Sequence, residues 1–302
     1  MNGRDFIVRL WGVRGSYAVP GNSTLKYGGN TSCVEVRVKN HIIILDAGTG
    51  IINLGKRLLN EFRNNSIHIS LLISHTHNDH LQGFPFFAPA YKPGCTLNIY
   101  GPKSFSQDLD QILTHTMEPQ YSPIGLDELS SQINIHNLHE NDILILNGSS
   151  QNPDIFTQDQ VQQTTQNDVI IRVMRSYAHP KVGSYLFRVE LNGKSMVYAT
   201  DTEGYVGGDT RLIEFAKNTD LLIHDAQYEP EEYTDVRFPK QGFGHSTFAM
   251  AAQTAKSAHA KQLVLFHHDP LHDDAKIASM ETEAKKLFHN SIAGAEGLEF
   301  SL

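Results

Sequence analysis

A six-residue run at positions 75–80, HTHNDH, contains three histidines and one aspartate. Imidazole and carboxylate groups are the nitrogen and oxygen ligands that zinc and similar divalent ions take in proteins. His75 and His77 are two positions apart, so on an extended backbone their side chains point the same way. Asp79 and His80 are adjacent and face elsewhere if the chain turns into a helix there. The run therefore predicts that one segment contributes ligands to two metal ions, in preference to a set of hydrogen-bonded core histidines.

Other polar residues stand directly after predicted strands, as this run does. His179 and Asp201 each follow a short apolar or alternating segment. A lone histidine in such a place is more often a hydrogen-bonded loop residue than a ligand. A carboxylate at Asp201 could bridge two metal ions and hold them about 3.5–4 Å apart. The apolar strand predicted at 263–266 is followed by both His267 and His268, and register favours His267, because it comes directly after the four apolar residues.

A second motif, Gly-His-Ser-Thr at positions 244–247, precedes a helix predicted at 248–259. Ser246 or Thr247 would serve as its N-cap. The free N–H groups and the dipole at a helix start favour an anion such as phosphate. The same residues also suit a helix cap without any ligand.

Two supporting carboxylates have two interpretations each. Asp46 follows the apolar strand predicted at 42–45 and is either a turn or cap residue or a partner that orients the metal-binding run. Asp225, with His224, ends another apolar strand and is open to the same two interpretations. We also predict a helix at 104–117.

The HTHNDH run matches the HxHxDH signature of the metallo-β-lactamase superfamily, and Leu-Gln-Gly at 81–83 is also typical of it. The Gly-His-Ser-Thr motif resembles the phosphodiesterase branch, which includes the tRNA 3′-processing endonuclease and cyclic-nucleotide phosphodiesterases. Many relatives have Trp or Leu where this chain has Asn78, a position that supplies no metal ligand. The resemblance implies an α/β fold, the αββα sandwich, in which two mixed β-sheets are flanked by helices. It also implies a single domain over residues 1–302.

The resemblance further implies a site with two divalent metal ions, zinc first and manganese or iron as alternatives. The ligands would be His75, His77 and His179 on one ion, Asp79, His80 and His267 on the other, and Asp201 as the bridge. A water between the two cations would lose its proton near neutral pH and become the nucleophile. Asp79 would help to orient this water, and His245 would contact phosphate and act as general acid.

Composition sets limits on the protein class. The 302 residues are 40% hydrophobic and 19% charged, as in ordinary soluble proteins. No apolar run approaches the about 20 residues of a membrane helix, and the N-terminus lacks the pattern of a signal peptide. Cys33 and Cys95 form no metal or redox motif, so we expect a cytoplasmic protein without a membrane partner. The segment 151–167 is rich in Gln, Thr and Asn and predicts a mobile loop.

These features predict a metal-dependent hydrolase, most directly a phosphodiesterase acting on a small or cyclic nucleotide. The formal net charge of −8 argues against broad capture of long nucleic acid, which needs a basic face. A small anionic substrate is compatible with it, because two bound cations reverse the local field. The alternatives are a thioester, ester or lactone hydrolase of the same fold and a metal-stabilised regulatory or binding protein without turnover. The sequence leaves homodimerisation open.

Overall fold

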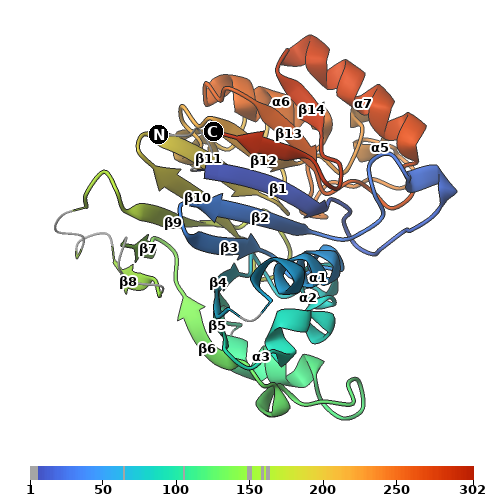
Figure 1. The fold of residues 1–302 in the computed structure, drawn as a ribbon. Helices are drawn as coiled ribbons and strands as arrows, with labels where there is room; N and C mark the ends of the chain where they lie inside the picture. The colour runs from blue at the N-terminus through green and yellow to red at the C-terminus, as the bar shows by residue number, and fades with distance from the viewer. Residues whose placement is uncertain (1–5, 64, 105, 148–151, 158–159, 161–163) are drawn as a thin grey trace.

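Two β-sheets lie face to face in the computed structural model, and helices cover the outer surface of each sheet (Figure 1). The structure describes residues 6–302 except 64, 105, 148–151, 158–159 and 161–163. This arrangement confirms the predicted α/β class and the αββα sandwich with two mixed sheets.

The first sheet has seven strands. Their order is β15 (Glu299–Ser301), β1 (Phe6–Gly12), β2 (Cys33–Val38), β3 (His41–Leu45), β4 (Ile67–Leu72), β5 (Cys95–Pro102) and β6 (Gln132–Leu138). The pairs from β15 to β3 are antiparallel, and those from β3 to β6 are parallel. The C-terminal ends of β3 and β4 therefore lie side by side.

The second sheet has eight strands. Their order is β14 (Ser291–Ala293), β13 (Leu263–Phe266), β12 (Leu221–Asp225), β11 (Lys194–Ala199), β10 (Ser184–Leu191), β9 (Val169–Ser176), β7 (Ile143–Leu146) and β8 (Asp154–Phe156). The pairs from β14 to β11 are parallel, and the remaining pairs are antiparallel. The parallel part brings the ends of β11, β12 and β13 to one edge.

The helices divide between the two outer surfaces. The α-helices are α1 (Gly50–Phe62), α2 (Asn78–Leu81), α3 (Leu109–Thr116), α4 (Thr210–Phe215), α5 (Pro230–Tyr233), α6 (Phe248–Ser257) and α7 (Asp274–Leu287). Short 3-10 helices are η1 (Asn22–Thr24), η2 (Phe84–Phe86), η3 (Ala88–Tyr91) and η4 (Leu126–Glu128). Apolar side chains of α1, α2 and α3 pack on the first sheet, and those of α4, α6 and α7 pack on the second. No described helix is long and apolar enough to cross a bilayer.

Successive side chains on each strand point to opposite faces of the sheet, and this separates the apolar core into layers. On β3, Ile43 and Leu45 face the second sheet, whereas Ile42 and Ile44 face the helices. Strands covered on both sides must be apolar on both sides, which explains why β3 and β13 are continuous apolar runs. The layer between the sheets includes Phe187 of β10, which is fully buried.

Two local predictions were wrong. The helix expected at 104–117 begins only at Leu109, where Asp108 and Gln111 form a capping box. Within the segment 151–167, residues Asp154–Phe156 form β8 and pair with β7 instead of remaining a loop. Residues 151, 158–159 and 161–163 of that segment lie outside the described part. Propensity missed β8 because the strand is only three residues long within a polar segment, and pairing with β7 supplies its order.

Truncation of Phe187 tests the inter-sheet layer. We expect Phe187→Ala to lower the free energy of unfolding by about 3–5 kcal/mol, because it leaves a cavity between two rigid sheets. Phe238, whose side chain is 73% exposed, is the matched control. Phe238→Ala should change the same quantity by no more than about 0.5 kcal/mol. Urea unfolding of the metal-free proteins measures both, and equal effects would contradict the proposed layer.

Candidate metal centre and active site

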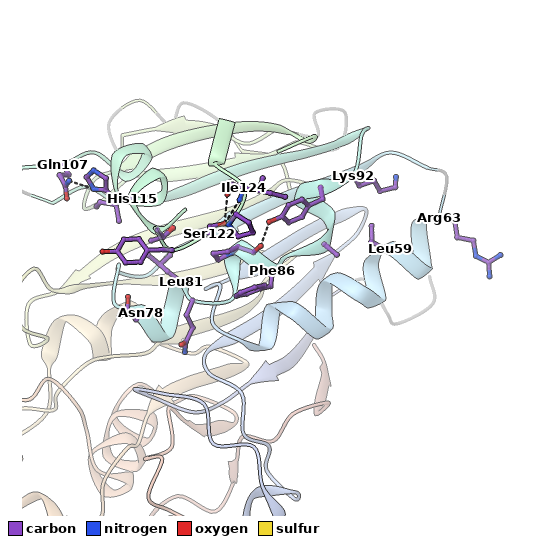
Figure 2. A pocket seen from close by; sticks show the side chains of 18 residues that line it. Leu59, Arg63, Asn78, Leu81, Phe86, Lys92, Gln107, His115, Ser122 and Ile124 are labelled. Carbon is purple, nitrogen blue, oxygen red and sulfur yellow. Dashed lines mark hydrogen bonds between the residues drawn. The ribbon is translucent and has the colours of Figure 1, made fainter. Parts of the chain in front are cut away.

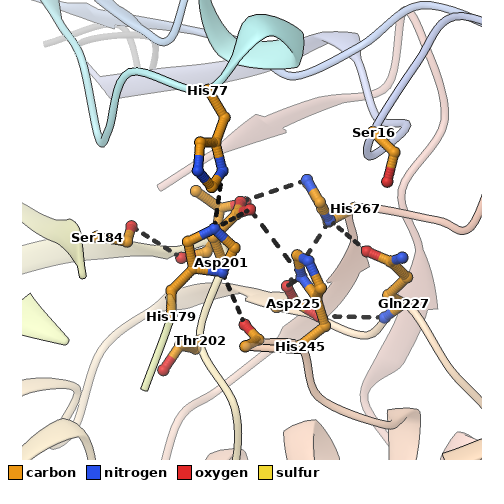
Figure 3. A network of polar contacts seen from close by, with 12 residues as sticks. Ser16, His77, His179, Ser184, Asp201, Thr202, Asp225, Gln227, His245 and His267 are labelled. Atoms are coloured by element: carbon orange, nitrogen blue, oxygen red, sulfur yellow. Dashed lines mark hydrogen bonds and ion pairs between the residues drawn. The ribbon is translucent and has the colours of Figure 1, made fainter. Parts of the chain in front are cut away.

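The segments that follow β4, β9, β11 and β13 meet at one edge of the sandwich and bring all the predicted ligands together. Within each of two groups, one ligand atom per residue lies within 4.8 Å of all the others. The groups are His75, His77 and His179, and Asp79, His80, Asp201 and His267. Figure 3 shows His77, His179 and Asp201 gathered beside His245 and His267. The fold thus places seven side chains from four chain segments around one small volume.

In the first group, three imidazole nitrogens point at each other. Nδ1 of His77 lies 3.0 Å from Nε2 of His75 and 3.0 Å from Nε2 of His179. Nδ1 of His75 contacts the Ser74 hydroxyl at 3.1 Å, and Nδ1 of His179 donates to the Gly244 carbonyl at 3.3 Å. Because those contacts take up the Nδ1 hydrogens, the Nε2 lone pairs of His75 and His179 are directed inwards. Converging lone pairs fit a cation.

In the second group, two imidazoles face two carboxylates. Nε2 of His80 lies 3.3 Å from Asp79 Oδ2 and 3.1 Å from Asp201 Oδ2. Nε2 of His267 lies 3.2 Å and 3.3 Å from the same two oxygens. The His80 Nε2 atom is fully buried and has no hydrogen-bond partner in the described structure. An orphaned buried nitrogen among carboxylates fits a second cation.

Asp201 connects the two groups. Its Oδ1 lies 3.6 Å from His75 Nε2 and 3.7 Å from His179 Nε2. Its Oδ2 is the oxygen that faces His80 and His267. One carboxylate oxygen per group is the geometry of a bridging ligand. The residues therefore fit two divalent cations, while the assignment of each ligand stays a prediction.

The protonation states favour metal uptake. Burial lowers the pKa of His75 well below its usual value and that of His179 to about 4, so both are neutral donors. Burial opposes ionisation of Asp79 and Asp201, but the surrounding imidazoles outweigh it and lower the pKa of both. For His80, burial is outweighed by neighbouring carboxylates, which raise its pKa. A cation would displace the proton that His80 otherwise holds.

Asp46 orients the metal-binding run from behind. Its carboxylate accepts hydrogen bonds from the Ser74 N–H at 2.7 Å and the Ser74 hydroxyl at 2.8 Å. It also accepts from Nδ1 of His80 at 2.8 Å and from the Tyr198 hydroxyl at 2.8 Å. The N-cap position of α1 belongs to Thr49, so Asp46 is not a helix cap. Of the two interpretations left open by the sequence, the orienting one matches the geometry.

The backbone bends sharply at three of these positions. Asp46, Asp201 and His267 have φ angles of 64°, 50° and 62°, each directly or shortly after a strand. Non-glycine residues rarely adopt this left-handed conformation, and it concentrates at functional sites. The turn redirects each side chain from the sheet direction toward the shared centre.

Two glycines allow close packing against the ligands. A Cβ atom on Gly15 would lie 2.3 Å from Cε1 of His267, and one on Gly244 would lie 2.4 Å from Nδ1 of His179. Gly244 also has a φ of +87°, which strains other residues. Next to Gly15, the Ser16 N–H donates to Asp79 Oδ2 at 2.7 Å. The loops that contain Gly15 and Gly244 therefore pack directly against the His267 and His179 side chains and restrict their orientation.

His245 adjoins the metal donors. Its Nδ1 donates to Asp225 Oδ2 at 2.8 Å and lies 4.0 Å from Asp201 Oδ1. Its ring stacks on His267 with centroids 4.9 Å apart. Burial opposes the charged form, but Asp225 and other carboxylates outweigh it and raise the pKa of His245 to about 9. His245 can therefore hold a proton at neutral pH. Thr247, and not Ser246, caps α6, accepting from Met250 N at 3.2 Å.

The structure adds residues that sequence patterns did not identify and excludes one alternative. Tyr198 and Ser16 contact Asp46 and Asp79, yet Tyr198 reads as an ordinary strand residue and Ser16 as loop. Only the packing of the two sheets on each other and of the loop after β1 on the site reveals them. His268 faces away, with Nε2 3.0 Å from the Gly294 carbonyl oxygen, so His267 is the one among the donors.

A cavity of about 1290 Å³ lies on the other face of α2 (Figure 2). Asn78, Leu81 and Gln82 line it, whereas Asp79 and His80 belong to the metal donors. Its other walls include the exposed ring of Phe86. The cavity is largely apolar and lies beside the donors instead of over them, so we assign the chemistry to the histidine cluster.

Substitution of Asp46 tests the orienting role. An asparagine amide has one acceptor oxygen for four donors and presents its own N–H groups to them, so His80 loses its fixed orientation. We expect Asp46→Asn to weaken zinc affinity by about 10- to 100-fold. Competition with a chromophoric chelator measures this, with the exposed Asp127→Asn as control. An unchanged affinity would contradict the role of Asp46.

Zinc binding itself has a stability signature. At a zinc concentration of about 100 times Kd, we expect the Tm of the metal-free protein to rise by about 5 °C or more. Asp201→Asn should lose most of this rise, because one donor then no longer serves both ions. The exposed Asp110→Asn on α3 should keep it. Scanning calorimetry with and without zinc gives the answer, and a rise of equal size in Asp201→Asn would refute the bridge.

Known proteins resemble this chain over most of its length. A model of the β-lactamase superfamily domain matches residues 41–268. Ribonuclease Z of Picrophilus torridus is 25% identical over 305 residues, covering 93% of this chain and 93% of that protein. Ribonuclease Z of Bacillus subtilis is 25% identical over 77% of this chain and 80% of that protein.

Solved structures share the fold. A metallo-β-lactamase fold protein from Bacillus subtilis superposes with a TM-score of 0.68 at 18% identity, covering 98% of each chain. The short form of human tRNase Z gives 0.62 at 21% identity, again over 98% of each chain. These matches confirm the predicted superfamily, its phosphodiesterase-like branch and a metal-dependent hydrolase. The chain therefore belongs to the family defined by the β-lactamase superfamily domain.

Proposed function

We propose that this protein hydrolyses a phosphodiester bond in a small or cyclic nucleotide. The supporting observation is the His245–Asp225 pair, which lies against the metal donors with His245 stacked on His267. A histidine that holds a proton beside a two-cation site suits the departure of a poor leaving group such as a nucleoside oxygen. The neighbouring residues would bind the cations and orient the attacking water.

The protein side chains would hold the two cations, orient the attacking water and deliver a proton to the leaving oxygen. When bound, the two cations supply Lewis acidity toward water and the phosphate oxygens. Asp79, fixed by the Ser16 N–H, orients the attacking water. Asp225 holds the Nδ1 hydrogen of His245, so the proton that reaches the leaving oxygen comes from Nε2. The bond formed joins water oxygen to phosphorus, and the bond broken joins phosphorus to the leaving oxygen.

A second candidate substrate is RNA. Its support is that two relatives of similar length are named ribonuclease Z. The net charge of −8 favours the smaller substrate, because a protein that captures long nucleic acid needs a basic face. We further propose that residues 1–302 act as a single domain in a reducing cytoplasm, which suits the buried free thiols of Cys33 and Cys95.

A substrate panel tests the proposal. Bis(p-nitrophenyl) phosphate, cyclic nucleotides, short dinucleotides, a precursor tRNA, a thioester and a lactone should be assayed with added zinc, manganese or iron(II). We expect metal-dependent cleavage of the nucleotides. Preference for the precursor tRNA would favour the second candidate, and thioester or lactone turnover alone would favour the non-phosphate hydrolase. Bound metal without any turnover would support a regulatory protein and overturn the proposal.

The loss of activity on removal of the proposed acid should depend on the leaving group of the substrate. We expect His245→Ala to lower kcat for nucleotide esters by about 10²- to 10⁴-fold. Bis(p-nitrophenyl) phosphate should suffer far less, because p-nitrophenolate departs without a proton. His289→Ala, at an exposed position, is the control and should match the wild type on both esters. Equal losses on both esters in His245→Ala would speak against an acid role.

A further inference from the structure

The loop between α5 and α6 is anchored to the metal centre at its C-terminal end. Glu203, nearly buried, accepts the N–H groups of Gly242 and Gly244 at 2.8 and 2.9 Å and the Tyr233 hydroxyl at 2.5 Å. The Gly244 carbonyl in turn receives Nδ1 of His179. This anchor ties Gly242 and Gly244 to the predicted ligand His179, so the segment that carries Phe243 lies at the rim of the site.

Lys240 on this loop is a cation held against two aromatic rings. Its Nζ lies 5.7 Å from the ring centre of Tyr228 and 5.5 Å from that of Phe243. The Tyr228 ring is itself 6.1 Å from the His245 ring. These contacts are within the range of cation–π attraction and hold the ammonium group against Tyr228, whose ring contacts that of the proposed acid.

The Lys240 ammonium has no carboxylate partner in the described structure; Lys56 and Lys256 also have none, but they are exposed, whereas Lys240 is half-buried. Other lysines are paired. Lys276, Lys261 and Lys286 all form ion pairs. In a chain with a net charge of −8, acidic partners are plentiful. A half-buried, unpaired ammonium beside an anion-binding site is therefore available to a negatively charged ligand group.

Phe243 completes the arrangement. Its side chain is 51% exposed, although it directly precedes the buried Gly244 and His245. An aromatic ring that remains exposed on an anchored loop offers a flat face for stacking. Base–aromatic stacking next to a cation is the usual way that proteins hold unpaired nucleotides.

We infer that Lys240 and Phe243 form a nucleotide subsite on the departing side of the scissile phosphodiester. Phe243 stacks the base of the departing nucleoside, and Lys240 pairs with a phosphate on the far side of that nucleoside. This inference rests on the proposed function and narrows its substrate to a linear nucleotide with a second phosphate. The bond broken joins phosphorus to the 3′ oxygen of the departing nucleoside, so that in 5′-phosphorylated diadenosine monophosphate (pApA) the 5′ phosphate lies on the far side of that nucleoside. It follows that pApA is a better substrate than ApA.

The experiment compares kcat/KM for pApA, ApA and bis(p-nitrophenyl) phosphate in the zinc-loaded full-length protein. We expect Lys240→Met to lose about five-fold or more on pApA, with ApA and the aryl ester unchanged, and Lys240→Arg to keep the wild-type preference. The pApA preference should also shrink with added salt. Lys256→Met, an exposed lysine of α6, is the charge control.

The stacking part is tested on both dinucleotides. We expect Phe243→Leu to lose about ten-fold or more on pApA and on ApA, and Phe243→Trp to retain activity. Phe86→Leu, in the cavity behind α2, is the matched aromatic control. A loss in Phe86→Leu without one in Phe243→Leu would place the base in that cavity and overturn the subsite.

The remaining outcomes separate the subsite from the proposed function. Cleavage of both dinucleotides with Lys240→Met and Phe243→Leu equal to wild type would overturn the subsite alone. Cleavage of cyclic nucleotides but of neither dinucleotide would also overturn the subsite alone, whereas cleavage of no nucleotide at all would overturn both the subsite and the proposed function. Elemental analysis of each variant shows that two metal ions per chain are retained, so that a lost ligand is not mistaken for a lost subsite.

Discussion

One buried carboxylate links the two sheets by hydrogen bonds behind the candidate active site. Asp46, at the end of β3, accepts hydrogen bonds from Ser74 and His80 on the first-sheet side and from Tyr198 on β11 of the second sheet. A buried carboxylate with four donors is well solvated by the protein, whereas the loss of one donor leaves an expensive unpaired group. The orientation of His80 therefore depends on the packing of both sheets.

The predicted metal ligands, unlike Asp46, lack enough hydrogen-bond partners within the described part of the protein. Five imidazoles and two carboxylates gathered in one small volume, all of them buried except His77, are unfavourable unless their charges and lone pairs are matched. Two divalent cations would supply that match and would give His80 Nε2 the partner that it lacks in the described structure. Left-handed backbone at Asp201 and His267 adds strain. The surrounding β-sandwich, with its three apolar layers, stabilises this arrangement.

Acid, metal donors and rim form one connected unit. Asp225 orients His245, the proposed acid, and Glu203 fixes the loop in which Gly244 contacts the predicted ligand His179 and directly precedes His245. The unit sits where β11, β12 and β13 end in parallel, since side chains that leave parallel strands at one edge necessarily converge. A substrate bound on this rim would meet the proton donor and the cations in a fixed relation.

The sequence by itself predicted a metal-binding segment, because a dense HTHNDH run after an apolar strand is a local signal. The fold class and the hydrolytic chemistry followed from the resemblance of that run to the metallo-β-lactamase signature. The position of His179, Asp201 and His267 after strands made them candidates, and the resemblance assigned them as ligands. Tertiary structure alone decided that these residues meet, that His268 turns away and that β8 forms within 151–167. It also revealed Tyr198 and Lys240, because their partners are 152 positions away or belong to other segments. Such contacts arise from strand order and loop anchoring, which leave no periodic signal in the chain.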